Sequence, residues 1–498
     1  MSQTQTITIN FTGGIISPGF LHNILEAAEK LQVKHVRFGL RQQLLMDVPS
    51  KHAVSFKKAC HKIQAEFFDT KEATPNIVSS YVAAGIFTAD SWLREGVYKD
   101  IFGLFDYKPK LKINVCDSSQ AFVPFFTGNI NWISSSSQHF WHLYIRFPIT
   151  QKIYYWPELV YTNDIAALSE IIEQAIYAER GSYFGNEFAD GTALFNQVSL
   201  LTTYVSKKPD EVLALPDFSL PYYEGFNRQG NQYWLGIYRR DEMFPVTFLK
   251  EICSICIETK IGQFYTTPWK SIIIKGIEHA NRKLWDYALG KSRINVRHAA
   301  NELNWQVEDN TEEGLSLKRH VIRFFDKEDV RTFGLCFAVQ TKLSSGMFGS
   351  IVIRKCQVKN PHRLKALERF DILYKGDFNP NSSRLVLFRD NVEKNHIGTY
   401  LISLCKLFYD SEKHKLADGV KQLKESRLVA SYQPAGKKVH QCSHCFFVYD
   451  EAAGEPENNI SSGTTFQDLP STYCCNLCEA PKEDFREIEE QHLQLKTA

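Results

Sequence analysis

The sequence lacks the features that mark membrane, secreted and nucleotide-binding proteins. Its 498 residues contain no apolar run of about 18 residues, which excludes a membrane-spanning helix. The first residues have neither the basic start nor the apolar core of a secretory signal, so we expect a cytoplasmic protein. No phosphate-binding loop, dinucleotide fingerprint or Gly-x-Ser-x-Gly motif occurs. Lysine and arginine form no stripe interleaved with aromatic residues, which argues against nucleic-acid binding.

Net charge is also nearly absent, yet charge is unevenly distributed. The chain has 58 Lys and Arg against 56 Asp and Glu, a formal charge of +2. Residues 439–498 contain 11 acidic and 3 basic residues, a net of −8, which leaves 55 basic and 45 acidic residues, a net of +10, in the first 438. Either the acidic part docks on a basic surface, in the same chain or on a partner, or each part carries a solvated surface.

Cysteine is concentrated near one end of the chain. Five of the twelve cysteines fall within 37 residues, and the other seven are scattered and read as small buried side chains. In a reducing cytoplasm a dense cluster predicts a metal site and not a disulfide framework. Cys442 and Cys445, like Cys475 and Cys478, have Cys-x-x-Cys spacing, and two such turns can present four thiolates to one zinc or iron ion.

The residues between these pairs carry a family pattern. They include Tyr449-Asp450, the Gly-Thr-x-Phe-x-Asp-Leu-Pro loop at 463–470, and Tyr473 before the third cysteine. Residues 440–486 resemble rubredoxin along their whole length. The resemblance implies one iron ion on the four thiolates, which carries one electron, where the spacing alone would favour a structural zinc ribbon. A domain of about 50 residues needs a staple such as a metal ion.

Three positions beside the predicted ligands depart from the rubredoxin pattern. Glycine normally follows the second and fourth cysteines and proline the third, whereas this chain has Phe446, Glu479 and Asn476. Glycine permits a positive φ and a close approach of backbone N–H groups to the sulfurs. We therefore expect Phe446 and Glu479 to adopt a strained backbone or to alter those contacts. We expect Cys474 to be a packed side chain and not a ligand.

The rest of the chain contains a weak internal repeat. Each copy reads as strand, turn, helix and strand, and the second begins about 227 residues after the first, with Pro18 opposite Pro245. The copies comprise Ile7–Phe11, Leu21–Leu31 and His35–Val48, then Tyr233–Tyr238, Phe248–Thr259 and Gln263–Ile277. Two like halves predict a duplicated body with any cofactor between the halves. The alternative is that any two such units look alike.

The first copy carries a second family pattern. Its residues follow the order Gly-Gly, Pro-x-x-Leu, Arg-x-x-x-Arg-Gln, and later Pro-Lys-Leu-Lys-Ile, at Gly13, Pro18, Arg37 and Pro109 onward. This resembles the ferredoxin-like half-domain of siroheme sulfite and nitrite reductases, with Gly39 in place of a threonine. The resemblance implies that siroheme carboxylates or a small anion would be bound by Arg37, Arg41, Lys110 and Lys112. The alternative is that these are ordinary solvated charges at strand ends.

The cysteines that the catalytic reductases need are missing. Those proteins hold a four-iron cluster on Cys-x5-Cys and Cys-x3-Cys after the second half. Here Cys336, Cys356 and Cys405 have neither spacing, so we expect no four-iron cluster, and siroheme is possible but doubtful. A further pair, Cys253 and Cys256, lies in a helical pattern among isoleucines and is expected to pack in a core.

Together these patterns predict the fold class and its division. We expect an α+β protein with duplicated ferredoxin-like and siroheme-reductase-like halves plus a small metal-stapled rubredoxin domain. The expected parts are ferredoxin-like half-domains at 1–75 and 216–300, reductase-like halves at 76–215 and 301–430, a linker at 431–438 and a rubredoxin domain at 439–498.

Three functions are compatible with the sequence. The first is an electron-transfer protein, with one iron on four cysteines and a degenerate body that serves as a docking or delivery platform. Its partners would be a reductase as donor and an acceptor such as a nitrite or sulfite reductase. The second is a siroheme-dependent reductase of nitrite or sulfite that uses the rubredoxin as internal donor. The third is a zinc-ribbon interaction protein.

Overall fold

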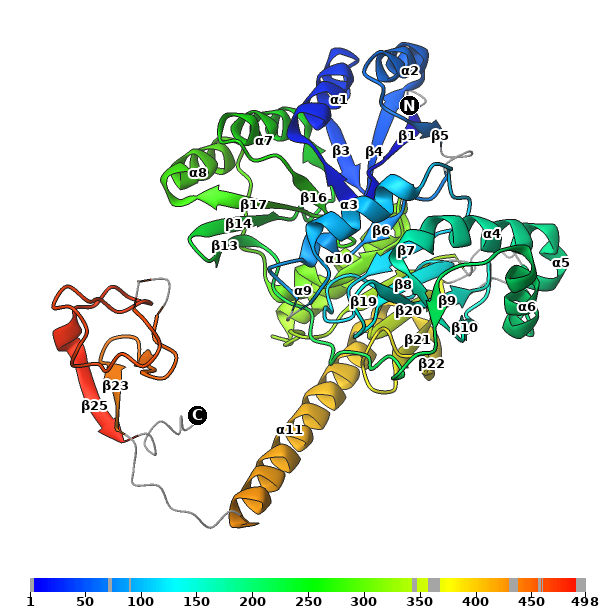
Figure 1. The fold of residues 1–498 in the computed structure, drawn as a ribbon. Coiled ribbons are helices and arrows are strands. Elements are labelled where there is room, and N and C mark those ends of the chain that lie inside the picture. The colour runs from blue at the N-terminus through cyan, green and yellow to red at the C-terminus, as the bar shows by residue number, and fades with distance from the viewer. Residues whose placement is uncertain are drawn as a thin grey trace. The chain divides into compact units, whose positions relative to one another are not determined.

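The computed structural model describes most of the chain, which divides into two compact units, Met1–Tyr409 and Asp410–Ala498 (Figure 1). Within these units the described residues are 4–69, 74–88, 91–342, 347–356, 368–429, 438–455, 458 and 460–489. The predicted linker, apart from Lys438, lies outside them. No helix in these ranges combines the length and the apolar character that a bilayer crossing needs.

Two five-stranded sheets of the first unit exchange a short strand. One has the order β15-β3-β4-β1-β5 and the other β13-β14-β17-β16-β2. The strands of the first half are β1 (Thr4–Asn10), β2 (Ile15–Ile16), β3 (His35–Phe38), β4 (Gln43–Pro49) and β5 (Phe68–Asp69). Those of the second are β13 (Gly225–Gln229), β14 (Gln232–Ile237), β15 (Phe244–Pro245), β16 (Phe264–Thr266) and β17 (Ile272–Glu278). Each half therefore completes the other's sheet through β2 and β15.

The exchange is symmetrical, which fixes the register of the internal repeat. Ile16 pairs with Phe264, and Phe244 pairs with Val36, so each residue of one pair lies 228 positions from its counterpart in the other. The duplicated architecture is thus present in the structure, with an offset one residue longer than the sequence pattern indicated. The position opposite Pro18 is accordingly Val246 and not Pro245.

Helices α1 (Pro18–Lys30) and α7 (Val246–Glu258) are the corresponding helices of the two copies and pack against each other (Figure 1). The side chain of Ser17 caps α1 by accepting a hydrogen bond from the Phe20 amide, and Pro18 fits the first helical position, where no amide donor is needed. Cys253 and Cys256 face the core and are fully buried, as predicted, and burial raises the pKa of Cys253 to about 12.

The other two sheets of the body also correspond. Each begins with three parallel strands and continues antiparallel, in the orders β12-β11-β9-β8-β7-β6, with β10 on β9, and β18-β19-β20-β21-β22. The first contains β6 (Val78–Ser79), β7 (Ile113–Cys116), β8 (Ile130–Ser134), β9 (Phe140–Arg146), β10 (Ile153–Tyr155), β11 (Leu159–Tyr161) and β12 (Ser206–Lys207). The second contains β18 (Trp305–Val307), β19 (Phe337–Gln340), β20 (Ile351–Lys355), β21 (Arg369–Lys375) and β22 (Leu385–Glu393).

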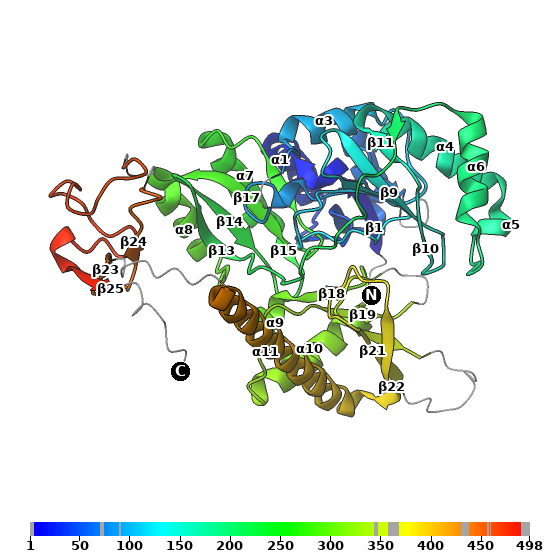
Figure 2. The ribbon, with the colours of Figure 1, turned by 60° about the horizontal axis from the view of Figure 1, so that its bottom comes forward.

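Helices cover these sheets and enclose separate apolar cores (Figure 2). They are α2 (Ala53–Lys62), α3 (Glu95–Leu104), α4 (Ile165–Ala178), α5 (Arg180–Tyr183), α6 (Gly191–Leu201), α8 (Arg282–Lys291), α9 (Ala300–Leu303), α10 (Glu312–Lys327) and α11 (Ile397–Val429). One core packs under α3 and α4, a second under α1 and α7, and a third under α10 and the start of α11. The predicted α+β class with duplicated halves is confirmed.

The two long strand patterns of the repeat are each interrupted by a turn. His35–Val48 forms β3 and β4, and Gln263–Ile277 forms β16 and β17. In the first turn the amide of Gln42 donates to the Gly39 carbonyl at 2.9 Å, and Gln42 has φ of 59°. Lys270, 228 positions later, has φ of 54°. These turns present Arg41 and Lys270 at the ends of paired strands, which the sequence pattern did not indicate.

The C-terminal domain contains a small antiparallel sheet of order β24-β23-β25. Its strands are β23 (Lys438–Cys442), β24 (Val448–Tyr449) and β25 (Phe485–Glu489). The sheet closes over an aromatic core of Tyr449, Phe466, Tyr473 and Phe485. The hydroxyl of Tyr473 donates to the buried Glu455 carboxylate at 2.8 Å, which satisfies both polar groups inside this core.

Candidate metal centre

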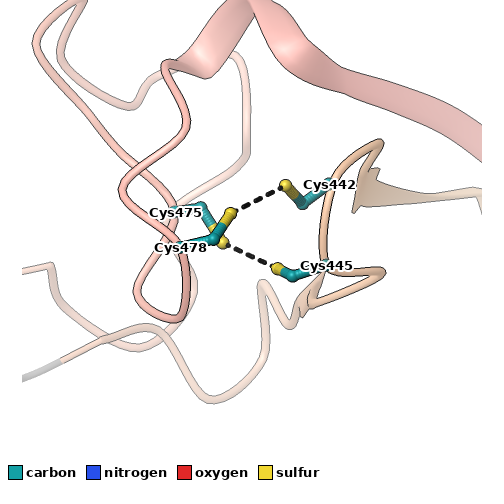
Figure 3. Close-up of side chains that lie close together, drawn as sticks. All are labelled: Cys442, Cys445, Cys475 and Cys478. Atoms are coloured by element: carbon teal, nitrogen blue, oxygen red, sulfur yellow. Dashed lines mark hydrogen bonds between the residues drawn. The ribbon is translucent and has the colours of Figure 1, made fainter.

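Four thiols meet at one end of the C-terminal domain. The sulfurs of Cys442, Cys445, Cys475 and Cys478 all lie within 4.8 Å of one another. Figure 3 shows that two come from each of two facing turns, with Cys442 opposite Cys478 at 3.6 Å and Cys445 opposite Cys475 at 3.4 Å. The structure therefore brings together the four residues predicted as metal ligands.

The two turns have the same backbone hydrogen bonds. The Cys442 amide donates to the carbonyl of residue 447 at 2.8 Å, and the Phe446 amide donates back to the Cys442 carbonyl at 3.0 Å. The Cys475 amide donates to the carbonyl of residue 480 at 2.8 Å, and the Glu479 amide donates back to Cys475 at 2.9 Å. Phe446 has φ of 62° and Glu479 has φ of 60°. Both residues thus take the strained conformation, and the turns retain their hydrogen bonds.

Backbone amides favour the thiolate forms that a metal ion requires. Burial raises the pKa of the Cys442 thiol, but the N–H groups of Cys445 and His444 donate to its sulfur and bring the pKa down to about 7. Burial raises the pKa of Cys475, although the N–H groups of Leu477 and Cys478 donate to its sulfur. Four close sulfurs with amide donors fit a tetrahedral ion of iron or zinc.

Cys474 lies beside this group without belonging to it. Its side chain is exposed, and its thiol contacts the Thr472 carbonyl at 3.6 Å. Its sulfur is not one of the four that lie within 4.8 Å of one another. This exposed position differs from the packed side chain that we expected, because Cys474 lies on the outward side of its turn while Cys475 points inward.

The positive φ at Phe446 and Glu479 has a measurable cost. A non-glycine residue in this region costs about 1–2 kcal/mol, part of which glycine returns through its freedom in the unfolded chain. We therefore expect Phe446→Gly and Glu479→Gly each to raise the free energy of unfolding of the C-terminal domain by about 1 kcal/mol. Denaturant unfolding followed by the visible absorption of the metal-loaded domain would measure this. Destabilisation by both variants would contradict the strain.

The structure separates the four basic residues that were predicted to bind a tetrapyrrole or an anion. Arg37 on β3 forms an ion pair with Asp47 at 2.7 Å and is already neutralised. Lys110 is exposed, and its ammonium lies 5.8 Å from the centre of the Tyr177 ring. Neither residue lines the cavity that contains Arg41 and Lys112.

Arg41 and Lys112 share a cavity of about 290 Å³ in the body. The Arg41 guanidinium donates to the carbonyls of Asn76 and Ile113 at 2.7 and 2.8 Å and to the Asn114 side chain at 3.2 Å. Burial lowers its pKa to about 9. Burial, with Arg41 nearby, lowers the pKa of Lys112 to about 8. The donors of Arg41 thus serve the protein's own oxygens.

The same cavity contains two acidic residues that sequence reasoning missed. Glu308 and Asp309 line it, and Asp309 accepts a hydrogen bond from the Leu40 amide at 3.2 Å. Lys270 contacts Asp309 at 3.3 Å and Glu242 at 2.7 Å. Aligning the copies at 228 residues would have placed Lys270 opposite Gln42 and signalled its position. Nothing in the local sequence marks Glu308 or Asp309.

These residues do not fit siroheme, which carries eight carboxylates. Arg41 is engaged by carbonyls, Arg37 by Asp47, and Lys110 lies elsewhere. Glu308 and Asp309 would repel added carboxylates at close range. The volume is also at the lower end of that for small-molecule sites, about 300–1,000 Å³. We derive no chemistry of the body through a tetrapyrrole.

The scattered cysteines of the body occupy separate environments. The Cys336 thiol lies 3.6 Å from the Ser350 hydroxyl, the Cys356 thiol contacts Asp371 at 3.2 Å, and the Cys116 thiol lies 3.5 Å from the Pro124 carbonyl. Cys405 is buried in α11. Within the described ranges, the C-terminal four are the one group of three or more Cys, His, Asp or Glu positioned to share a metal ion.

Comparison with known proteins agrees with both parts of the fold. Residues 439–485 match the model of the rubredoxin family. The chain is 46% identical over 52 residues to Rubredoxin 4 of Rhodococcus sp. (strain Q15), covering 87% of that protein, and 50% identical over 50 residues to Probable Rubredoxin-2 of Methanocaldococcus jannaschii, covering 89%. Each match spans 10% of this chain.

The body has a structural relative of its own. The NirA protein of Mycobacterium tuberculosis superposes with a TM-score of 0.61 at 13% identity, over 80% of this chain and 79% of that one. At this identity the likeness concerns the fold. The fold and the four-thiol site thus define a fusion of a small metal-thiolate electron-transfer domain with a NirA-like body. Through its C-terminal domain, the chain belongs to the rubredoxin family.

Proposed function

We propose that this chain is an electron-transfer protein in which the rubredoxin domain carries single electrons and the NirA-like body is a docking or delivery platform. The observation that carries the proposal is the four-thiol group of Cys442, Cys445, Cys475 and Cys478 inside a rubredoxin domain. An iron ion on four thiolates supplies a one-electron couple between its ferric and ferrous states. Such a site makes and breaks no bond, so it needs a partner that supplies electrons and one that accepts them.

The residues around the thiols are suited to this role. The aromatic side chains of Tyr449, Phe466, Tyr473 and Phe485 exclude water from one side of the site, which helps to set a reduction potential. Amide donors to Cys442 and Cys475 stabilise negative charge on sulfur. Cys445 is half-buried and Cys478 exposed, so the opposite side of the site is open to a partner.

The partners follow from the two parts of the fusion. A reductase would donate electrons to the rubredoxin domain, and an acceptor such as a nitrite or sulfite reductase would take them. The body's likeness to the NirA protein supports an acceptor of that class, since a related fold can pack beside it. The net charge of −8 on residues 439–498 favours partners with a basic surface.

A reductase activity of the body itself is a second candidate. The NirA-like fold favours it. The engaged guanidinium of Arg41 and the acidic lining of its cavity oppose it. It predicts a tetrapyrrole absorption band in protein produced with a supply of siroheme.

Metal analysis combined with an absorption spectrum separates the candidates. In protein purified from iron-replete, siroheme-supplied cells we expect about one iron per chain, the number that one set of four thiolates holds, and ferric-thiolate absorption that bleaches on reduction. Zinc in a colourless protein would contradict electron transfer and support an interaction module. A strong tetrapyrrole band that disappears in a variant of the cavity, such as Lys112→Ala, would instead support the reductase.

A further inference from the structure

The turn residues Phe446 and Glu479 keep a positive φ that glycine would adopt without strain. Strained backbone persists where the surroundings fix it, and it concentrates at functional sites. At Phe446 the surroundings are well defined: its amide donates to Cys442, and its carbonyl accepts a hydrogen bond from the Gln441 side chain at 3.1 Å. The backbone that carries this aromatic ring is therefore held in one position.

The ring of Phe446 contributes little to the folded domain. Its side chain is 65% exposed, and among the described residues it is not one of those that form or line the apolar core. By contrast, Phe466 and Phe485 are buried in that core. A strained backbone that presents an unpacked aromatic ring stabilises nothing within the domain, which points to a role outside it.

A second exposed apolar side chain lies on the other turn. Leu477 is 71% exposed and directly precedes Cys478, as Phe446 directly follows Cys445. Cys445 and Cys478 are the less buried thiols of the four, and all four sulfurs lie within 4.8 Å of one another. Phe446 and Leu477, which we name the exit patch, thus flank the side of the metal site that solvent reaches. Exposed apolar groups at such a place mark an interaction surface.

Acidic residues accompany the exit patch. Glu479 and Glu483 are exposed, and Asp484 accepts from the His444 ring at 3.0 Å within the same turn region. The complementary surface has an apolar centre and a basic rim. The rim charges would steer the encounter, and the buried aromatic ring would hold the complex.

We propose that the exit patch is the contact through which the rubredoxin domain passes its electron to a redox protein with a basic-rimmed, apolar docking surface. The inference rests on the proposed function. In the transfer, ferrous iron on the four thiolates is oxidised to ferric, and the metal of the acceptor is reduced by one electron. No bond forms or breaks, and no proton moves.

The test compares two glycine variants that relieve the same strain. Phe446→Gly removes the ring, whereas Glu479→Gly removes one rim charge and keeps the ring. The full-length protein is reduced and mixed with oxidised cytochrome c, a basic haem protein, or with ferricyanide, a small anion that needs no docking surface. The readout is the ratio of the two second-order rate constants, measured at low salt and at 0.5 M salt, roughly where screening reaches only a few Å.

For Phe446→Gly we expect this ratio to fall about tenfold at both salt concentrations, the scale of one aromatic anchor. Leu477→Ala should lower it in the same way. For Glu479→Gly we expect a smaller fall at low salt that disappears at high salt, because rim charges are screened. A ratio for Phe446→Gly equal to that of the wild type would overturn the exit patch. If neither acceptor oxidises an iron-loaded wild type, the proposed function itself is wrong, and the inference falls with it.

Discussion

Replacing Cys475 by serine is expected to abolish metal binding and to unfold the C-terminal domain. Cys475 is one of the two buried sulfurs, and its loss leaves three ligands for a tetrahedral ion. The core of the domain consists of eight buried side chains, two of which are themselves ligands. A core of this size does not hold a domain of about 50 residues without its metal. Folding and metal binding are therefore one transition.

Metal content, visible absorption and limited proteolysis of the full chain would measure this effect. The matched control is Cys474→Ser, which changes the neighbouring thiol, exposed and outside the group of four. We expect this variant to keep its iron, its spectrum and its resistance to protease. Retention of iron by Cys475→Ser together with its loss from Cys474→Ser would show that the ligand set has been assigned wrongly.

Replacing Arg41 by methionine is expected to lower the free energy of unfolding of the body by about 3–5 kcal/mol. The guanidinium is the donor for the buried carbonyls of Asn76 and Ile113 and for the Asn114 side chain. Methionine fills similar space and leaves these oxygens without that donor, at about 1–3 kcal/mol for each buried group. All eight tryptophans lie in the first unit, so tryptophan fluorescence during denaturant unfolding reports on the body alone.

The control for this prediction is Arg37→Met. Arg37 pairs with Asp47 at 2.7 Å, but both side chains are partly exposed, at 19% and 36%. Such pairs contribute about 0–1 kcal/mol, so we expect a small change. If Arg41→Met is as mild as Arg37→Met, Arg41 does not support the fold, and its guanidinium is available for a ligand after all.

Short-range patterns in the sequence were sufficient for several elements. Spacing and neighbouring residues located the four thiols, and the glycine-replacing positions at Phe446 and Glu479 predicted the strain that the structure contains. Burial of Cys253 and Cys256 followed from their helical spacing. Each of these predictions depends on residues within one turn or helix, where spacing along the chain determines distance in space.

Other features depend on residues far apart in the sequence. The exchange of β2 and β15 between the halves, which corrected the repeat to 228 residues, is visible only once strands pair. Arg41 matched a ligand position by pattern, yet its partners are Asn76 and the strand at Ile113. The acidic lining from Glu308 and Asp309 comes from the second half of the body.

The sequence by itself determined that this chain combines a four-thiolate rubredoxin domain with a duplicated body that lacks cluster cysteine spacing. It could do so because a metal turn is specified by a few consecutive residues, and missing thiols are visible in any order. Only the tertiary structure decided what the basic residues of the body do and which side of the metal site is open. Hydrogen-bond partners, cavity walls and exposure depend on long-range packing, and no local pattern encodes them.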